Sequence, residues 1–166
     1  LAVVLREALE LTGAERGFVV LTEGDRIAPV HVEKIDRSEL DHPAFQVSRT
    51  LIREALRAGK PVLFDLSARA EPPAATRSLA GTGVRAVACV PIAGGDEVLG
   101  ALYLDTHRDP RPLSTRLWSM ELFAGQAAAA LLNARAHRDA ARALEAAEQA
   151  IRLHRAAHEL RGQYGP

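Results

Sequence analysis

Residues 84–105 decide the fold: they read VRAVACVPI (84–92), AGGDE (93–97) and VLGALYLD (98–105). The two outer segments are rich in valine, leucine and other apolar residues, the composition expected of buried β-strands. The segment between them places Gly94-Gly95 before two acidic residues, a typical turn sequence. We therefore predict an antiparallel β-hairpin at these residues.

On the N-terminal side, the pattern predicts a helix and a second hairpin. Residues 1–11 carry apolar side chains at helical spacing, and Gly13 ends this helix. Residues 17–21 and 27–32 are β-rich and are joined by a short turn that contains glycine. Because Pro29 lacks an N–H group, we expect the second of these strands at an edge of the sheet.

A further helix, a strand and a long loop precede the first hairpin. Ser48 is a good N-cap for a helix over residues 49–58, which Gly59 ends. Residues 61–66 predict a short strand. Residues 67–83 contain two prolines and two glycines, so we expect a long loop with at most one weak helix. Long loops in compact domains often carry function.

After the hairpin, Ser114 is expected to cap a helix that continues to about Leu160. This helix would have about 47 residues and span about 70 Å, more than one domain can cover. The order of the elements, with neighbouring strands joined by short turns, predicts an α+β fold with an antiparallel sheet and helices on its faces.

The composition is that of an ordinary globular domain. Of the 166 residues, 48% are hydrophobic and 25% are charged, which argues against a disordered or membrane-embedded chain. The 21 basic residues balance 21 acidic ones, so direct contact with nucleic acid is not expected. Every apolar run is far shorter than the roughly 20 residues of a membrane span, and no signal peptide is visible. We expect a part of a longer cytoplasmic protein that does not contact a membrane.

Three stretches together resemble the GAF family of small-molecule sensor domains. They are the helix and strand entry at 47–62, the hairpin at 83–105 and the sequence FAGQAAAALLNAR at 123–135. The resemblance covers residues 1–136, which would be the sensor domain, and residues 137–166 would be a linker helix toward an output domain. It implies a central antiparallel sheet of five to six strands, helices on both faces and a long C-terminal signalling helix.

The resemblance also implies a ligand pocket on the sheet face opposite to the first and last helices, beneath residues 67–83. One face of the strand at 84–90 would form its floor. Arg85 could pair with an anionic ligand there, and the small side chains of Ala86 and Ala88 would leave space. The candidate ligand-binding residues are Phe45, Phe64, Leu66, Arg77, Leu79, Arg85, Ala86 and Ala88.

The residues offer no catalytic site, so we do not expect an enzyme. Cys89, the single cysteine, lies in the middle of an apolar strand, where a thiol behaves as a small hydrophobic group. His154 and His158 are spaced as in a zinc protease, but Arg155 stands where the catalytic glutamate would be, and we assign no metal. The family's pattern for cyclic nucleotides and its bilin-attaching cysteine are not recognisable, so the cofactor is left unknown.

The last helix carries a seven-residue spacing that links His137, Leu144, Ile151 and His158. Such a seam favours a parallel two-chain coiled coil, and hence a homodimer. The alternative is an alanine-rich helix whose apolar stripe meets another domain. Protonated histidines would bring like charges together at the seam, which suggests a dimer that weakens at low pH.

The last residues suggest two kinds of output domain. Residues 157–161 resemble the phosphoacceptor box of a sensor histidine kinase, but residues 162–164 replace the expected Thr-Pro-Leu. Residues 159–165 resemble the entry to the ATPase domain of sigma-54-dependent transcriptional activators, and this second match loses fewer residues.

Two functions follow as expectations. The first is a regulatory sensor domain that binds an unidentified small molecule and relays the signal along its C-terminal helix to an ATPase or kinase, in bacterial transcription regulation. The second is a ligand-free dimerisation module, in which Phe45, Phe64 and Leu79 collapse together and leave no cavity.

Overall fold

The computed structural model describes residues 1–24, 26–33, 43–67, 79 and 82–163, with only the backbone described at 43–48 and 160–163. The chain divides into two compact units, Leu1–Ala129 and Ala130–Pro166. The first unit contains the sheet, and the described part of the second is the remainder of the last helix.

A five-stranded antiparallel sheet forms the first unit, with the strand order β2-β1-β5-β4-β3. The predicted hairpin at 84–105 is confirmed: β4 (Ala86–Gly94) and β5 (Glu97–Thr106) pair across a two-residue turn. Gly95 in this turn has a φ of 64°, which favours glycine. The edge strand beside β4 is β3 (Val62–Asp65).

The second predicted hairpin is also confirmed, as β1 (Arg16–Glu23) and β2 (Arg26–Glu33). β2 is the outer strand of the sheet, where Pro29 was expected. The register shifts next to this proline, because Val19 pairs with His31 while Val20 pairs with Pro29. One residue of β2 is thus left over as a bulge, a common feature of edge strands.

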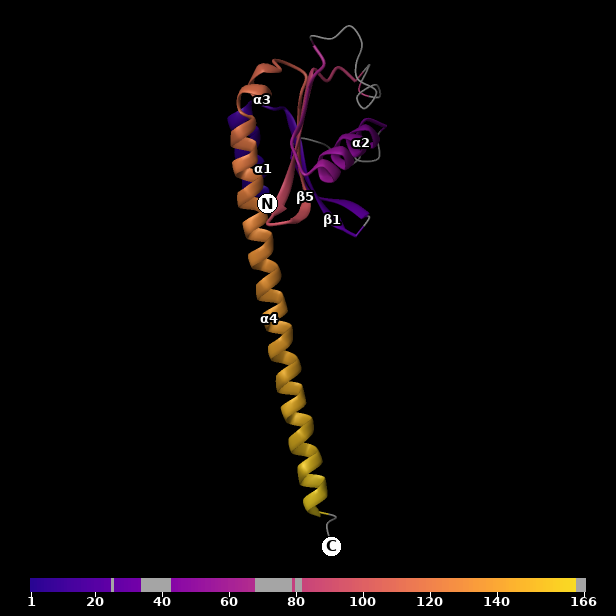
Figure 1. The fold of residues 1–166 in the computed structure, drawn as a ribbon, viewed down its shortest axis with the longest axis vertical. Helices are drawn as coiled ribbons and strands as arrows, with labels where there is room; N and C mark the ends of the chain where they lie inside the picture. The colour runs from indigo at the N-terminus through magenta and orange to yellow at the C-terminus, as the bar shows by residue number, and fades with distance from the viewer. Residues whose placement is uncertain (25, 34–42, 68–78, 80–81, 164–166) are drawn as a thin grey trace. The chain divides into compact units, whose positions relative to one another are not determined.

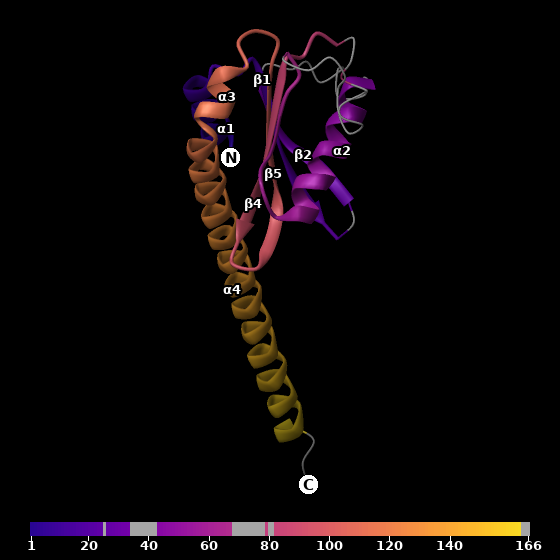
Figure 2. The ribbon, with the colours of Figure 1, turned by 45° about the horizontal axis from the view of Figure 1, so that its top comes forward.

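Helices cover both faces of the sheet, which confirms the predicted α+β class (Figures 1 and 2). α2 (Pro43–Ala58) lies on one face. α1 (Ala2–Thr12), α3 (Arg111–Thr115) and the start of α4 (Leu117–Gln163) lie on the other. As predicted, α1 ends at Gly13, which has a φ of 67°.

The expected start of α2 is wrong. The helix begins at Pro43, so Ser48 lies inside it and is not its N-cap. Proline suits the first turn of a helix, since its missing N–H would have no partner there and its φ is already helical.

The expected start of the last helix is also wrong, because the chain breaks at Arg116 between α3 and α4. Arg116 has a φ of −114° and a ψ of 21°, and its guanidinium donates a hydrogen bond to the carbonyl oxygen of Leu11 in α1. Ser114 does not cap a long helix, since its hydroxyl donates to the carbonyl oxygen of Arg111 within α3.

Alternation along the strands divides the buried residues between the two faces. On the face of α1, Gly17 lies so close to its neighbours that a Cβ there would come within 2.6 Å of Leu104 and 2.9 Å of Leu5. Ala88 pairs with Leu104, and paired residues share a face, so Ala88 belongs to this side. Met120, Ala124, Ala127 and Ala128 form the buried stripe of α4 in this unit.

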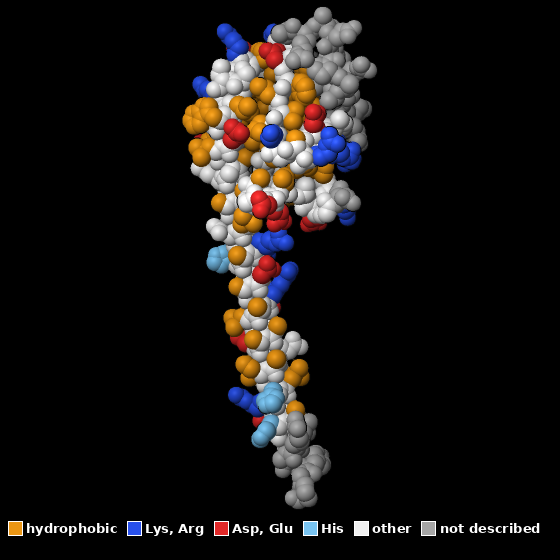
Figure 3. Space-filling view, in the orientation of Figure 1, with side chains coloured by type: hydrophobic (Ala, Val, Ile, Leu, Met, Phe, Trp, Pro, Cys, Tyr) orange, Lys and Arg blue, Asp and Glu red, His pale blue; other side chains and the backbone are white. Residues whose placement is uncertain are grey.

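The described part of the second unit is helical to Gln163, close to the predicted end near Leu160. Its side chains are exposed from Asn133 to Glu159, and hydrophobic groups are visible along it among charged ones (Figure 3). Leu144 and Ile151 of the predicted seam are 63% and 62% exposed, and Leu153 is 65% exposed. Of the described helices, none combines the length and the apolar character that spanning a membrane requires.

Candidate functional site

A cluster of buried side chains fills the sheet face beneath α2, and we call it the α2-face cluster. α2 contributes one apolar side of its helix, and β1, β4 and β5 contribute alternate residues. Its members are Phe18, Val20, Leu51, Ile52, Ala55, Leu79, Val84, Val87, Cys89, Ala101 and Tyr103. This is the face on which the ligand pocket was expected.

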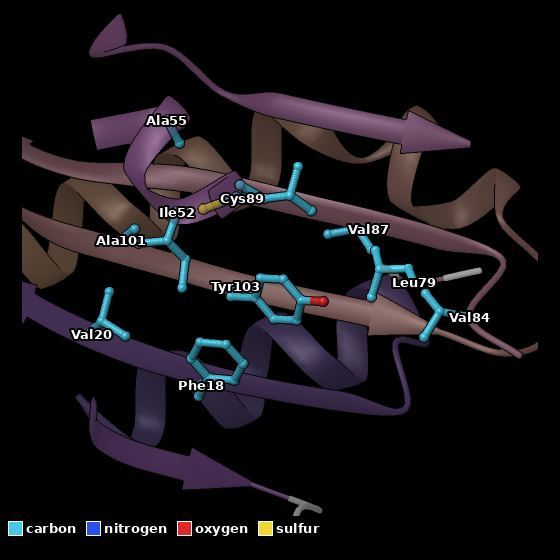
Figure 4. Close-up of a cluster of buried hydrophobic side chains, with 11 residues drawn as sticks. Phe18, Val20, Ile52, Ala55, Leu79, Val84, Val87, Cys89, Ala101 and Tyr103 are labelled. Carbon is cyan, nitrogen blue, oxygen red and sulfur yellow. The ribbon is translucent and has the colours of Figure 1, made fainter. Parts of the chain in front are cut away.

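Two aromatic rings lie at the centre of the α2-face cluster. Phe18 and Tyr103 are stacked, with ring centroids 4.4 Å apart and an angle of 13° between their planes. They face one another because they are directly paired across β1 and β5. The hydroxyl oxygen of Tyr103 points along the sheet toward Leu79 and Val84 (Figure 4).

A polar group bounds the cluster beside the tyrosine hydroxyl. Tyr103 donates a hydrogen bond of 3.3 Å to Oδ2 of Asp105. Arg16 donates to the same carboxylate through Nε and Nη2, each at 2.9 Å. The Asp105 side chain is only 4% exposed, so this two-fold contact supplies the partners that a buried carboxylate needs. An apolar surface with a few converging polar groups is the usual composition of a small-molecule site.

Several predicted site residues lie where they were expected. Leu79 is a buried member of the α2-face cluster, and the half-buried Phe64 and Leu66 pack against it. The side chain of Phe45 and all of Arg77 lie outside the described residues.

The structure places Ala86 and Ala88 elsewhere, so they are not the floor of this face. Adjacent strand residues point to opposite sides of a sheet, and Val87 and Cys89 occupy the α2 side. Because every residue from Ala86 to Ile92 is buried, the strand shows no polar and apolar alternation from which its faces could be read.

Arg85 is exposed and lies apart from the α2-face cluster. It precedes β4, where its N–H donates to the carbonyl oxygen of Thr106 and its own carbonyl accepts from Leu66, both at 2.8 Å. Its side chain lines a separate hollow with Arg108 and Arg111.

The sequence-based site missed Arg16, Phe18, Tyr103 and Asp105. One signal was available, since Tyr103 and Asp105 are two residues apart in a predicted strand and must share a face. The pairing of β1 with β5, which brings Arg16 and Phe18 to them, joins segments more than 80 residues apart and has no local signature.

The described side chains bear on whether this face holds a cavity. Leu79 is 2% exposed within the α2-face cluster, and Phe64 packs against the same cluster. Cys89 is fully buried among them, and burial raises the pKa of its thiol far above the usual range. Such a thiol is a poor nucleophile.

Comparisons with known proteins agree with the sheet topology. The GAF domain family model matches residues 1–132. The GAF-B domain of DevS from Mycobacterium smegmatis is 26% identical, with a TM-score of 0.58 over 83% of this chain and 94% of that chain. A GAF domain/HD domain protein from Geobacter sulfurreducens is 17% identical, with a TM-score of 0.55 over 80% of this chain and 89% of that one.

A third similar structure comes from a methyl-accepting chemotaxis protein. It is 19% identical, with a TM-score of 0.59 over 80% of this chain and 86% of that one. A search of curated protein sequences returned no match.

Proposed function

Because this chain belongs to the GAF domain family, we propose that it is a regulatory sensor domain of a signalling protein. It binds a small molecule on the α2 face of the sheet and relays the binding through α4 to an output domain. The likeness to a domain of a chemotaxis protein supports a signalling role. A ligand can shift the output only by the difference between its affinities for two arrangements of the protein.

The observation that carries the proposal is the polar end of the α2-face cluster. The Tyr103 hydroxyl points toward Leu79, the one described residue between Ala68 and Gly81, and donates to the Asp105 carboxylate. A ligand that replaces Leu79 in the cluster would meet an aromatic surface and these polar atoms together. The proposal therefore requires Leu79 to move when the ligand binds.

The mass of the purified protein under native and then denaturing conditions tests ligand binding. An excess mass that disappears on denaturation supports the sensor and gives the ligand's formula. Leu79→Trp, which adds bulk where the ligand would enter, should abolish the excess. Leu113→Met, a conservative change in the buried part of α3, is the control and should retain it.

The alternative function is a ligand-free dimerisation module. The Phe18–Tyr103 stack and the burial of Leu79 favour it, because the protein's own side chains occupy the expected site. Absence of any excess mass in protein purified from its native host, together with a stable dimer, would favour this second function.

We also propose that the protein is a homodimer. Trp118 and Leu122 on α4 are 67% and 55% exposed, and Val3 on α1 is 65% exposed, which is unusual for large apolar side chains on a monomer. In the second unit, Leu144 and Ile151 are exposed seven residues apart, the spacing of a coiled-coil seam.

Sedimentation of three variants tests the seam. Leu144→Glu and Ile151→Glu should each weaken the dimer by at least tenfold, because each buries a charge at the seam. Leu153→Glu is the matched control, since Leu153 is equally exposed but lies off the seven-residue spacing. Equal effects of all three variants, or a monomeric parent protein, would contradict the seam.

We propose transcription regulation as the output, through a sigma-54-type ATPase, and no catalysis by this domain itself. The support is the resemblance of residues 159–165 and the inert setting of Cys89. The coding sequence downstream of residue 166 tests the output: an ATPase core supports it, and a kinase core replaces it.

A further inference from the structure

A charged hollow of about 610 Å³ lies at one end of the sheet, apart from the α2-face cluster. Five charged residues line it: Asp65, Arg85, Arg108, Asp109 and Arg111. Asp65 follows Phe64 in β3 and therefore points to the opposite face from the cluster that Phe64 contacts. Three separate segments meet here, namely the end of β3, the entry to β4 and the connection from β5 to α3.

Both carboxylates of the hollow are already occupied by neighbours within their own segments. Asp109 accepts hydrogen bonds from the Arg111 side chain at 2.7–3.0 Å, and these bonds lower the pKa of Asp109. Asp65 accepts through Oδ1 from the backbone N–H and the hydroxyl of Ser67, at 2.9 and 2.6 Å.

The arginines of the hollow are less completely paired with carboxylates. Arg108 forms an ion pair with Glu15 through Nε, at 2.8 Å from Oε1. Within the described ranges, no carboxylate lies at ion-pair distance from Arg85. Three guanidinium groups and two carboxylates line the hollow. Among these arginines, Arg85 is the one whose charge acts on a described carboxylate, that of Asp109, only from beyond ion-pair distance.

The backbone holds these residues at the end of the sheet. Thr106, the last residue of β5, accepts from the Arg85 N–H through its carbonyl oxygen and from the Arg108 N–H through its hydroxyl, at 2.8 and 3.1 Å. The Arg111 N–H donates to Oδ1 of Asp109 at 3.0 Å. Each arginine thus begins from a fixed position, which reduces the entropy lost when its side chain binds a ligand.

We propose that this hollow binds a small oxyanion with two or more negative charges, of the organic phosphate class, between Arg85 and Arg108. Planar guanidinium groups bind phosphate oxygens in pairs, and an anion of one charge would gain too little against the nearby Asp65 and Asp109. Because the arginines are exposed, binding should be weak and should fall with added salt. This site is separate from the one beneath α2 and does not depend on it.

Binding at this site would have a structural effect within the first unit. Arg85 immediately precedes β4 and its backbone is hydrogen-bonded to Thr106 and Leu66, while Arg108 precedes α3 and Arg111 is the first residue of α3. An anion held between these arginines would fasten the segment that leads into α3 to the sheet.

Calorimetric titration with inorganic pyrophosphate at constant ionic strength tests the proposal. We expect saturable binding, weakened about tenfold by Arg85→Gln. Arg53→Gln is the matched control, since Arg53 is an exposed arginine on α2, and it should leave the affinity unchanged. Asp109→Asn removes a repelling charge and should strengthen binding severalfold.

Two results would overturn the proposal. One is the lack of saturable binding up to about 10 mM pyrophosphate, because a site with a Kd above this concentration would be too weak to be useful. The other is an equal loss of affinity in the Arg53→Gln and Arg85→Gln proteins, which would indicate a nonspecific effect of net charge. Should Arg85→Gln fail to fold, as checked by circular dichroism, weaker rather than stronger binding by Asp109→Asn would overturn the proposal instead.

Discussion

Arg16 and Asp105 form a two-fold ion pair between β1 and β5, at the end of the sheet where β1 begins, with Nε–Oδ1 and Nη2–Oδ2 distances of 2.9 Å. The two residues are direct partners in the pairing of β1 with β5. The Asp105 side chain is 4% exposed and that of Arg16 is 24% exposed, so most of the pair is shielded from water. Removing either side chain would remove both of these charge-assisted hydrogen bonds.

Asp105→Asn should therefore lower the free energy of unfolding by about 2–4 kcal/mol, because it removes the buried negative charge to which the Arg16 guanidinium donates two hydrogen bonds. Asp96→Asn, in the exposed β4–β5 turn, should change it by less than about 0.5 kcal/mol. Denaturant unfolding measures both. The Arg16→Gln and Asp105→Asn double variant should lose less than the sum of the single variants, and strict additivity would contradict the pair.

Three glycines should respond differently to alanine. A Cβ on Gly100 would lie 2.1 Å from the carbonyl oxygen of Val20, and backbone cannot move aside, so Gly100→Ala should cost at least about 3 kcal/mol. Gly17→Ala meets the flexible ends of Leu104 and Leu5 and should cost about 1–2 kcal/mol. Gly125→Ala, in α4 with open space, should stabilise by about 1 kcal/mol. Any other order in thermal unfolding would contradict the packing of the sheet.

Glu15 should make stability depend on pH. The backbone N–H of His107, 2.6 Å from Oε2, lowers the pKa of Glu15 from about 4.5; burial opposes this, and the charge of Arg108 adds to it. A carboxyl group whose pKa is lowered by folding stabilises the folded protein at pH values above the pKa of the unfolded state. This stabilisation is lost as the pH falls through the pKa of the folded state.

Glu15→Gln should consequently lower the free energy of unfolding by about 1 kcal/mol at pH 7. The difference from the parent protein should shrink below about pH 4. Glu7→Gln, on the exposed side of α1, is the control and should have little effect at either pH. A difference that grows on acidification would show the opposite linkage.

Cys89 should be unreactive in the folded protein. Burial raises the pKa of its thiol, and a thiol reagent needs both the thiolate and access to it. Labelling should require denaturation, whereas the exposed Ser114→Cys thiol should label at least 100-fold faster. Rapid labelling of Cys89 in the parent protein would mean that the α2-face cluster opens readily.

The elements that the sequence predicts well are those with local signals. The β4–β5 hairpin has a glycine turn between two apolar runs, and Pro29 marks β2 as an edge strand. The predicted helix starts at Ser48 and Ser114 were wrong. The first turn of α2, which begins at Pro43, has a weak apolar pattern. The break between α3 and α4 lies at Arg116, whose side chain contacts α1, and a local pattern does not show such a contact.

The candidate site was harder to predict than the fold. Both faces of β4 are buried, so its sequence carries no sign of which residues lie beneath α2, and Ala86 and Ala88 were assigned to the wrong side. The Arg16–Asp105 pair depends on β1 lying beside β5, a long-range contact that only the assembled sheet creates.

The hydrogen bond from Arg116 to Leu11 joins the end of α1 to the start of α4, and α1 and the first turns of α4 run in opposite directions (Figure 1). Polypeptide therefore enters and leaves the sheet unit at neighbouring points. A module with adjacent ends can be duplicated, exchanged or inserted within a longer gene without a spacer that crosses its width. Recombination can then join this domain to new output domains while its sheet stays unchanged.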